Sequence, residues 1–515
     1  MKKLLFTFIL AAAGLAGQAQ PHREWARTFT NFGNDHFYTL AAATTPDSAA
    51  LISGYSRQTN GSSFNDLKIT LARYNTNGTV AWNNMLKLPA YGFVSDKYLQ
   101  LDQSGNSYLT ASIFRVDNSG NYISKILLWK VNPAGNTVMI DTITHDGNAF
   151  FFHINNQDEK FLLYFQTVGN LMRRYDANDQ LQWIRLATPD YIEKAFWSES
   201  GDFAFQAFDS LHYISKEAAN IWTYPTIQAG FGGGYTYFEG DYLYNLYYGY
   251  NIRKYIWSRY HRITGQLEEV DSTLRGEPMT FGNDLTYGAF NYNGSHAFVG
   301  VEDTQSRSQT CMRSGGTIWN TLHYNGIEAT DWMYDSQQYT YLTGPQTLWT
   351  PLPAAPPVFY RINNDNGDSE MIDSFMIGEQ TNFQKILADG GKTLYLFGDA
   401  TDNELGKVVL VKYNKDLLQH QTNVRQDTFN AAISAVREVA MQPSFRLYPN
   451  PAGEWVRIEM LNGSYADVQL YDIMGRKLRT IQAKPGASVT VSLTGLPAGT
   501  YIVQAGAYRT QLVKY

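Results

Sequence analysis

The stretch Ala72–Trp82, ARYNTNGTVAW, decides the fold of this chain. A basic residue and an aromatic residue end one strand, and the Asn-Gly pair that follows favours the backbone of a tight turn. A second strand then begins and reaches a tryptophan. The stretch predicts one β-hairpin.

Similar stretches recur at Trp129–Met139 (WKVNPAGNTVM), Arg173–Trp183 (RRYDANDQLQW), His212–Trp222 (HYISKEAANIW), Ser258–Glu268 (SRYHRITGQLE), Tyr360–Glu370 (YRINNDNGDSE) and Val411–Gln421 (VKYNKDLLQHQ), with a weaker copy at His323–Trp332. A second kind of hairpin precedes them, seen at Leu99–Ile113, Ile386–Ala400 and Thr39–Ser56. Two hairpins make a four-stranded antiparallel sheet with a period of about fifty residues.

Such sheets bury their faces when they are stacked around an axis, which predicts an all-β fold, a β-propeller. The unit resembles the bacterial propeller repeat written G-D-x-A, D-x-x-G-N-x-Y, K-Y-D-x-x-G-x-x-x-W, over most of residues 24–421. The spacing favours seven blades and allows eight, because His261–Arg361 holds one or two units.

The segment Glu24–Phe29, EWARTF, looks like the last strand of a unit that has nothing before it. We expect it to complete the last blade and close the ring, because a closed ring leaves no free sheet edge.

The first nineteen residues predict a secretory signal peptide. Lys2 and Lys3 precede the apolar run LLFTFILAAA, and small residues favour cleavage between Ala19 and Gln20. No later apolar run is long enough to predict a transmembrane segment in the mature chain. Cys311 is the only cysteine, so no intramolecular disulfide can form.

Charge is unevenly spread along the sequence. Residues 443–515 hold 8 basic and 4 acidic residues, whereas the rest, without the two signal lysines, holds 31 basic and 43 acidic ones, a net charge of −12. Nucleic-acid binding needs clustered cations, and this sequence has no such cluster. We therefore expect no nucleic-acid partner.

The C-terminal residues form a second pattern. LYPNPAGEWVRIEM begins at Leu447, and VQLYDIMGRKLRTI, SLTGLPAGTYIVQA and YRTQLVKY follow it. Apolar residues alternate in these runs, which predicts about seven short strands in a small Ig-like β-sandwich. The pattern resembles the type A C-terminal sorting domain of the Bacteroidetes type IX secretion system, and the motif residues are Pro449, Asn450, Pro451, Gly475, Arg476, Gly499, Tyr501 and Lys514.

The resemblance implies a route and a place for the protein. It implies export through the periplasm by the type IX translocon, tail removal by a sortase-like peptidase, and an extracellular or outer-membrane surface location. Anchoring to anionic lipopolysaccharide and release into the medium both stay open. The expected parts are a signal peptide at 1–19, a propeller cargo at 20–421, a linker at 422–442 and the sorting domain at 443–515.

No catalytic, cofactor-binding or metal-binding residues are predicted. The sequence contains neither H-E-x-x-H nor G-x-S-x-G. GGKT at Gly390–Thr393 lacks the first glycine of a phosphate loop and falls in a predicted hairpin turn. Whether the protein is an enzyme stays open, and the balance is against it.

The densest unusual stretch is Phe231–Tyr260, in which Tyr235, Tyr237, Tyr242, Tyr244, Tyr248 and Tyr250 recur in pairs at a period of two. Such residues pack between blades or form an aromatic binding surface. The sequence favours a propeller that binds a glycan or protein partner. The alternatives are a secreted hydrolase or lyase with its site at the channel mouth, and a structural surface component.

Overall fold

The structure is a computed structural model that describes residues 22–515 apart from short segments. These segments are 32–35, 58–66, 89–90, 117–121, 146–149, 167–168, 189–191, 193–194, 208–209, 226–234, 250–253, 272–287, 293–294, 304–307, 314–315, 323–330, 336–338, 346–355, 364–367, 403–404, 416–423, 430–444, 461–465, 473–475, 484–487 and 506–507. The signal peptide and its cleavage residues Ala19 and Gln20 lie outside the described residues.

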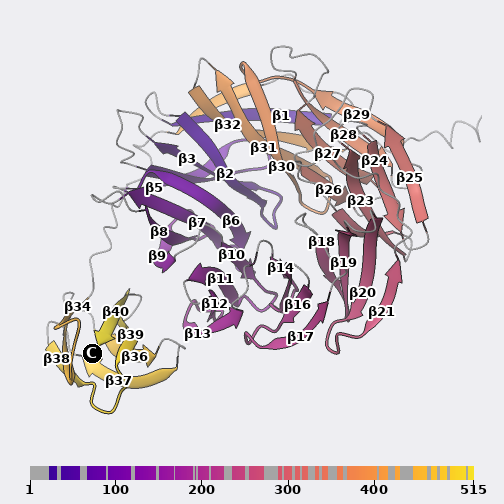
Figure 1. Cartoon of the computed structure of the whole chain (residues 1–515). Coiled ribbons are helices and arrows are strands. Elements are labelled where there is room, and N and C mark those ends of the chain that lie inside the picture. The colour runs from indigo at the N-terminus through magenta and orange to yellow at the C-terminus, as the bar shows by residue number, and fades with distance from the viewer. Residues whose placement is uncertain are drawn as a thin grey trace, which may run out of the picture.

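Eight sheets stand around a central axis in the described part of the chain before residue 430 (Figure 1). Seven of them consist of four consecutive antiparallel strands, so each is built from two hairpins. The first strands of neighbouring sheets contact one another, as in the pairs β30 with β2, β2 with β6, β18 with β22 and β26 with β30. This arrangement is a β-propeller in which each sheet is one blade, and the predicted fold class is confirmed.

The strands of the first four blades follow chain order. Blade 1 has β2 (His36–Thr44), β3 (Ala50–Arg57), β4 (Leu67–Tyr74) and β5 (Val80–Leu88). Blade 2 has β6 (Phe93–Leu101), β7 (Ser107–Val116), β8 (Tyr122–Val131) and β9 (Thr137–His145). Blade 3 has β10 (Phe150–Ile154), β11 (Lys160–Gln166), β12 (Gly169–Tyr175) and β13 (Leu181–Thr188). Blade 4 has β14 (Ala195–Trp197), β15 (Phe203–Ala207), β16 (Ser210–Ile214) and β17 (Asn220–Pro225).

Blades 5 to 7 continue the same order. Blade 5 has β18 (Tyr235–Glu239), β19 (Tyr242–Gly249), β20 (Lys254–His261) and β21 (Leu267–Asp271). Blade 6 has β22 (Gly288–Tyr292), β23 (Ser295–Asp303), β24 (Ser308–Arg313) and β25 (Gly316–Leu322). Blade 7 has β26 (Asp331–Asp335), β27 (Tyr339–Pro345), β28 (Pro357–Asn363) and β29 (Ser369–Ser374).

Blade 8 combines both ends of the propeller sequence. Its strands are β30 (Gln380–Ala388), β31 (Thr393–Asp402), β32 (Leu405–Asn414), β1 (His22–Asn31) and β33 (Val424–Phe429). β1 pairs antiparallel with β32, with Ala26 opposite Val411, which confirms the predicted closure. β33 lies within the segment expected as a linker and pairs in parallel with β1, so β1 is held on both sides.

The described strands form eight blades, the second of the two numbers that the sequence allowed. Residues 261–361, for which the sequence allowed one or two units, contain the whole of blade 6 and the first two strands of blade 7. The prediction that a weaker repeat copy ends at Trp332 is wrong. Trp332 lies on β26, and the preceding strand β25 belongs to a different sheet, so Trp332 does not end a hairpin. The hairpin of blade 6 is β24 with β25, and its tryptophan is Trp319. Cys311 lies on β24 of the same hairpin.

Many of the described hairpin turns share one hydrogen-bond pattern, which explains the repeated Asn and Gly. In the turn at 75–79 the Asn75 N–H donates to the Thr79 carbonyl and the Gly78 N–H donates to the Asn75 carbonyl, both at 2.9 Å. The fourth residue has a positive φ, 79° at Gly78, as a type I turn with a following bulge requires. In GGKT at Gly390–Thr393, the first three residues lie in the turn between β30 and β31 and Thr393 begins β31, so the predicted hairpin turn is confirmed.

The repeated tryptophan packs against the repeated glycine of the next blade. Trp82 Nε1 on β5 donates to the Pro133 carbonyl at 2.9 Å, and a Cβ added at Gly135 would lie 2.6 Å from Trp82 Cγ. The corresponding bonds join Trp222 to the Arg262 carbonyl (2.8 Å) and, across the ring closure, Trp25 to the Thr76 carbonyl (3.0 Å). Tryptophan and glycine of the repeat are therefore partners across blade boundaries.

The C-terminal part is a sandwich of two sheets. One sheet has β34 (Phe445–Tyr448), β35 (Trp455–Met460) and β38 (Ser488–Ser492), and the other has β37 (Lys477–Ala483), β36 (Ala466–Asp472), β39 (Gly499–Ala505) and β40 (Tyr508–Lys514). Alternate residues of both sheets form one core that includes Ile458, Val468, Leu470, Val491 and Val503. The predicted seven-stranded sandwich is confirmed, whereas the domain limits 20–421, 422–442 and 443–515 stay predictions.

Candidate functional site

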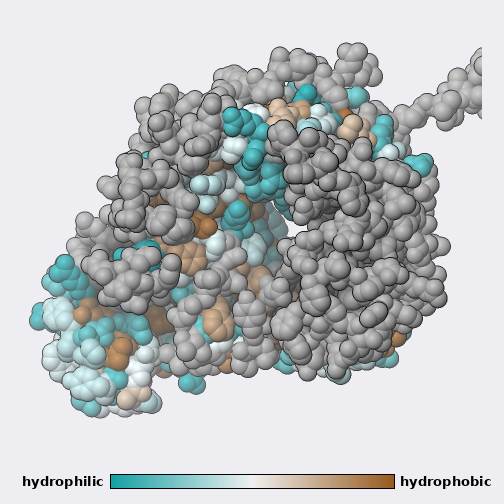
Figure 2. Space-filling model, turned by 45° about the horizontal axis from the view of Figure 1, so that its top comes forward, coloured by the Kyte–Doolittle hydropathy of each residue, from teal (hydrophilic) through white to brown (hydrophobic). Residues whose placement is uncertain are grey.

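Four hairpin turns border an open hollow of about 360 Å³ at one mouth of the ring. Each turn joins the first two strands of its blade, and the turns come from blades 8, 1, 2 and 3. The lining residues are Thr44, Thr45, Pro46, Leu101, Asp102, Gln103, Asn155, Asp158, Ala388 and Asp389. Figure 2 shows hydrophilic (teal) and hydrophobic (brown) side chains together on the described side of the central hollow.

The polar side chain that opens each turn supports its own backbone. Asp102 Oδ1 accepts from the Asn106 N–H and Oδ2 from the Asn106 amide, both at 2.8 Å. Asp389 Oδ1 accepts from the Gly391 N–H at 2.7 Å. Burial opposes ionisation of Asp389, but hydrogen bonds from Ser48, Gly391 and Thr393 outweigh it and hold the pKa of this carboxyl below its usual value.

Hydrogen bonds also join the turns in two pairs. The Gln103 N–H of blade 2 donates to Asp158 Oδ1 of blade 3 at 2.8 Å, and the Gln103 amide donates to the Asn156 carbonyl at 2.6 Å. Thr44 Oγ1 of blade 1 donates to the Ala388 carbonyl of blade 8 at 2.9 Å. The hollow is lined by members of both pairs, and its walls are therefore preorganised.

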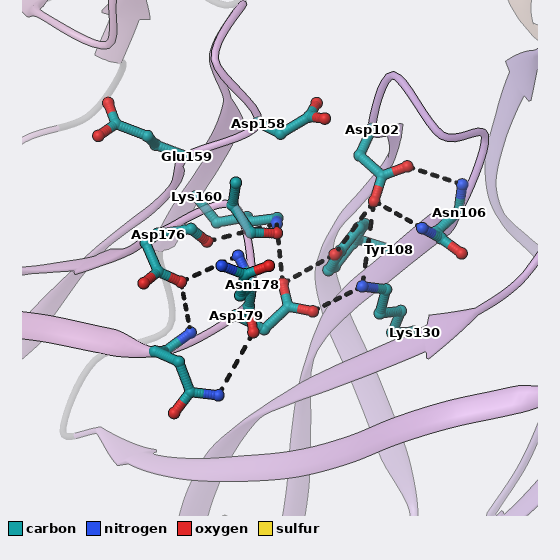
Figure 3. Close-up of polar contacts among 12 residues, drawn as sticks. Asp102, Asn106, Tyr108, Lys130, Asp158, Glu159, Lys160, Asp176, Asn178 and Asp179 are labelled. Carbon is teal, nitrogen blue, oxygen red and sulfur yellow. Dashed lines mark hydrogen bonds and ion pairs between the residues drawn. The ribbon is translucent and has the colours of Figure 1, made fainter.

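An ion network lies beside the hollow and begins at Asp102 (Figure 3). Lys130 Nζ lies 4.0 Å from Asp102 Oδ2 and 2.6 Å from Asp179 Oδ2, and Lys160 Nζ lies 2.9 Å from Asp179 Oδ1. Tyr108 donates to Asp179 Oδ1 at 2.8 Å. Lys160 is 1% exposed, so two ammonium groups and two carboxylates balance each other away from water.

The network shifts the acidities of its members in the directions that burial and charge require. Burial raises the pKa of Asp179, but hydrogen bonds from Lys130 and Lys160 outweigh it and leave the carboxyl below its usual value. Burial and the two carboxylates raise the pKa of Tyr108 well above its usual range. Asp179 is therefore an ion and Tyr108 a neutral donor at neutral pH, and the network supports the mouth.

The network occupies the place of a tryptophan–glycine contact. Met139 ends the repeat copy of blade 2 where the copies of blades 1, 3 and 4 end in tryptophan, and Asp179 takes the fourth turn position, with φ of 63°, where blades 1 and 2 have glycine. These two departures were visible in the sequence. They were the signal that could have drawn attention to Lys130 and Lys160, which the sequence reading missed.

The predicted aromatic surface divides into described and undescribed side chains. Tyr244 is 3% exposed, so it packs inside the blade, the role that the sequence also allowed. Tyr242 is half-buried, and the Arg259 guanidinium lies 5.0 Å from its ring centre. Tyr235, Tyr237 and Tyr248 lie on β18 and β19, but their side chains and the whole of Tyr250 are outside the described residues. A binding role for the set stays a prediction.

The sorting-motif residues hold the end of the chain in place. Asn450 Nδ2 donates to the Gln511 carbonyl at 2.7 Å, and its Oδ1 accepts from the Val513 N–H at 2.9 Å, so its amide pairs with the free edge of β40. Pro449 and Pro451 flank it. Lys514 Nζ donates to the carbonyls of Leu493 (3.0 Å) and Leu496 (2.6 Å).

The other motif residues make local contacts. Tyr501 donates to the Pro497 carbonyl at 2.6 Å, four residues before it. Arg476 Nε donates to Asp472 Oδ2 at 2.7 Å. Gly499 begins β39, and Gly475 lies outside the described residues. The described motif residues therefore build the domain.

One comparison with known proteins concerns the C-terminal sandwich. Residues 446–515 match the family described as the secretion system C-terminal sorting domain. The chain thus carries a type IX sorting tail, which implies secretion to the cell surface or the extracellular space. No curated protein matches the chain in sequence.

Several solved structures share the general architecture. The Dos1 propeller is similar over 80% of this chain and 97% of its own, with 7% identity and a TM-score of 0.36. The β-propeller domain of the trilobed protease from Pyrococcus furiosus is similar over 74% and 96%, with 8% identity and a TM-score of 0.36. PorZ, a surface component of the type IX secretion system of Porphyromonas gingivalis, is similar over 93% and 81%, with 9% identity and a TM-score of 0.26. Because these TM-scores are low, the propeller is assigned from the strand order of this chain and not from the similarity.

Two further observations concern the described residues alone. They contain no helix with the length and hydropathy needed to cross a bilayer. Within the same residues, no three His, Cys, Asp or Glu side chains come together in a way that could hold a metal ion.

Proposed function

We propose that this exported protein is a binding protein, and that its propeller holds an extracellular glycan or protein partner at the mouth hollow. The observation that supports the proposal is that hydrogen bonds hold the carboxylates of the hollow in fixed positions. Asp102, Asp158 and Asp389 each accept hydrogen bonds from a turn at the mouth. The hollow thus offers fixed polar groups for recognition, on turns that the rigid blades position.

A hydrolase or lyase at the same mouth is the alternative. Glycoside hydrolysis, for example, uses two carboxyl groups with separate protonation states on either side of the scissile bond. Asp389 has a lowered pKa, which suits an acceptor and not a proton donor at neutral pH. No contact among the described mouth residues favours the alternative.

A blocking substitution tests the proposal. Pro46→Trp places a large side chain in the hollow, and Ala134→Trp places one in an exposed turn of blade 2 that does not line it. The purified exported protein is offered a panel of polysaccharides and outer-membrane proteins. We expect binding to at least one of them that Pro46→Trp removes and Ala134→Trp leaves. A panel without any binding, or binding that both variants retain, contradicts the proposal.

The finer steps of export are part of the proposal. We expect a sortase-like peptidase to remove the tail, with anchoring to anionic lipopolysaccharide or release afterwards. A chain without residues 443–515 should collect in the periplasm, as cell fractionation and immunoblotting would show. Unchanged export of that chain would contradict the role of the tail.

A further inference from the structure

We infer that the mouth hollow takes a neutral, hydroxyl-rich ligand, the end of an uncharged saccharide chain, and excludes anionic saccharides. The inference rests on the proposed function and adds the chemical class of the ligand. It follows from the charge of the lining, from the lone pairs that the lining leaves open, and from the apolar groups between them.

The charge of the lining is negative. Asp102, Asp158 and Asp389 are among its ten residues, which include neither lysine nor arginine. The ammonium groups of Lys130 and Lys160 beside the hollow are paired with Asp179. An anionic group in the hollow would therefore meet negative charge without a cation among the lining residues to balance it, which is unfavourable.

The open lone pairs favour hydroxyl donors over a guanidinium group. Both oxygens of Asp102 accept hydrogen bonds from Asn106, and Oδ1 of Asp158 accepts from the Gln103 N–H. A guanidinium group binds best when both oxygens of one carboxylate are free to accept. A sugar hydroxyl needs only one acceptor position, such as Oδ2 of Asp158.

Apolar groups alternate with these acceptors. Pro46 is exposed at the rim, and Leu101 and Ala388 are half-buried in the wall. A sugar ring presents C–H groups and hydroxyl groups side by side, so it can contact both kinds of wall. The hollow of about 360 Å³ is at the small end of the usual range for ligand sites, which fits a chain end of one or two rings.

Two substitutions and a matched control test the inference by calorimetric titration of the full mature chain. The probes are a set of neutral oligosaccharides (gluco-, manno- and xylo-oligomers) and a set of uronic-acid and sulfated oligomers. Asp158→Asn keeps an acceptor for the Gln103 N–H and a residue that tolerates the positive φ of 58°, but removes the charge. We expect it to weaken binding of the neutral probe about tenfold.

Gln103→Lys introduces a cation into the hollow. We expect it to weaken binding of the neutral probe and to strengthen binding of the uronic-acid probe by about tenfold, which reverses the selectivity. Asp47→Asn is the control, because Asp47 lies on the turn of blade 1 but does not line the hollow; its affinities should equal those of the unmodified protein.

The outcomes separate the inference from the function on which it rests. Stronger binding of the anionic probes by the unmodified protein overturns the inference, and so does neutral binding that Asp158→Asn and Gln103→Lys leave unchanged. If no oligosaccharide binds, the inference is overturned, while a protein partner displaced by Pro46→Trp keeps the proposed function. Loss of every partner, saccharide or protein, overturns both.

Discussion

The boundary between blades 1 and 2 and the boundary between blades 2 and 3 join the same structural elements with different chemistry. At the first, Trp82 lies on Gly135 and donates to the Pro133 carbonyl. At the second, Lys130 and Lys160 share Asp179. The contrast teaches that side chains must fill the space between neighbouring blades, but that different residue pairs can do so. It also shows that the charged groups of the second boundary lie beside the mouth hollow.

The largest expected effect comes from removing the shared counter-ion. Asp179→Ala removes the carboxylate that the two ammonium groups share, so among the described residues Lys130 keeps only Asp102 at 4.0 Å and Lys160 keeps only backbone carbonyls. We expect it to lower the free energy of unfolding by about 3–5 kcal/mol. Urea unfolding followed by tryptophan fluorescence measures the change. Asp47→Ala, which breaks an exposed pair with Arg73, should cost less than about 1 kcal/mol. Equal losses in the two variants would show that the network does not stabilise the boundary.

The next effect tests the tryptophan–glycine boundary. Gly135→Ala adds a Cβ that would lie 2.6 Å from Trp82 Cγ at a φ of 86°, and we expect a loss of about 2–3 kcal/mol from strain and displacement. Gly105→Ala has a similar φ of 76° but places its Cβ 3.4 Å from Pro133 Cγ, so it should lose only about 1 kcal/mol. The difference isolates the contact with Trp82. Identical losses would assign the whole cost to backbone conformation.

A pH titration separates a third boundary, between blades 3 and 4, from the ion network. His153 stacks on Trp197 at 5.2 Å, and burial lowers its pKa from 6.5 to about 4. Between pH 6.5 and 4, His153 is protonated in the unfolded chain but stays neutral in the folded chain. The free energy of unfolding therefore falls as pH drops through that window. At pH 5 the loss is about 2 kcal/mol.

The network should respond in another window. Asp179 has a folded pKa below the usual 3.8, so its stabilisation is present above pH 3.8 and is lost as pH falls further. His153→Phe should flatten unfolding free energy between pH 6.5 and 4 and leave the change below pH 4. An unchanged slope between pH 6.5 and 4 would rule out His153 as its source.

The smallest effect concerns single tryptophan hydrogen bonds. Trp82→Phe removes the bond to the Pro133 carbonyl and should cost about 1 kcal/mol beyond the lost packing. Trp183 is the matched case, because its Nε1 has no hydrogen-bond partner among the described residues. Trp183→Phe should therefore cost less in the same thermal unfolding experiment. A larger cost for Trp183→Phe would contradict the role given to the Trp82 bond.

The sequence predicted what local chemistry determines. One hairpin is specified within eleven residues: Asn75 favours the turn, Gly78 adopts its positive φ, and Trp82 packs against the next blade. The hairpins could therefore be predicted from the sequence. The repeat is weak in blades 6 and 7, and Trp332 resembles the end of a hairpin although it lies on β26, the first strand of blade 7. The alternation of Ile458, Val468 and Val491 predicted the sandwich for the same local reason.

The mouth hollow could not be predicted in this way. Thr45, Asp102, Asn155 and Asp389 each look like ordinary turn residues, and each does support its own turn. Only the ring brings blades 8, 1, 2 and 3 together, across almost the whole length of the propeller sequence. The dense tyrosine pairs favoured an aromatic binding surface in the sequence, yet Tyr244 is buried within its blade.

Hydrogen exchange of the exported protein with its bound partner tests the central claim most directly. The account predicts that binding slows exchange in the four mouth turns, around residues 44–49, 101–106, 155–159 and 388–393, and leaves the hairpin of β18 and β19 unchanged. Slower exchange confined to β18 and β19, with the mouth turns unaffected, would place the partner elsewhere and contradict the account.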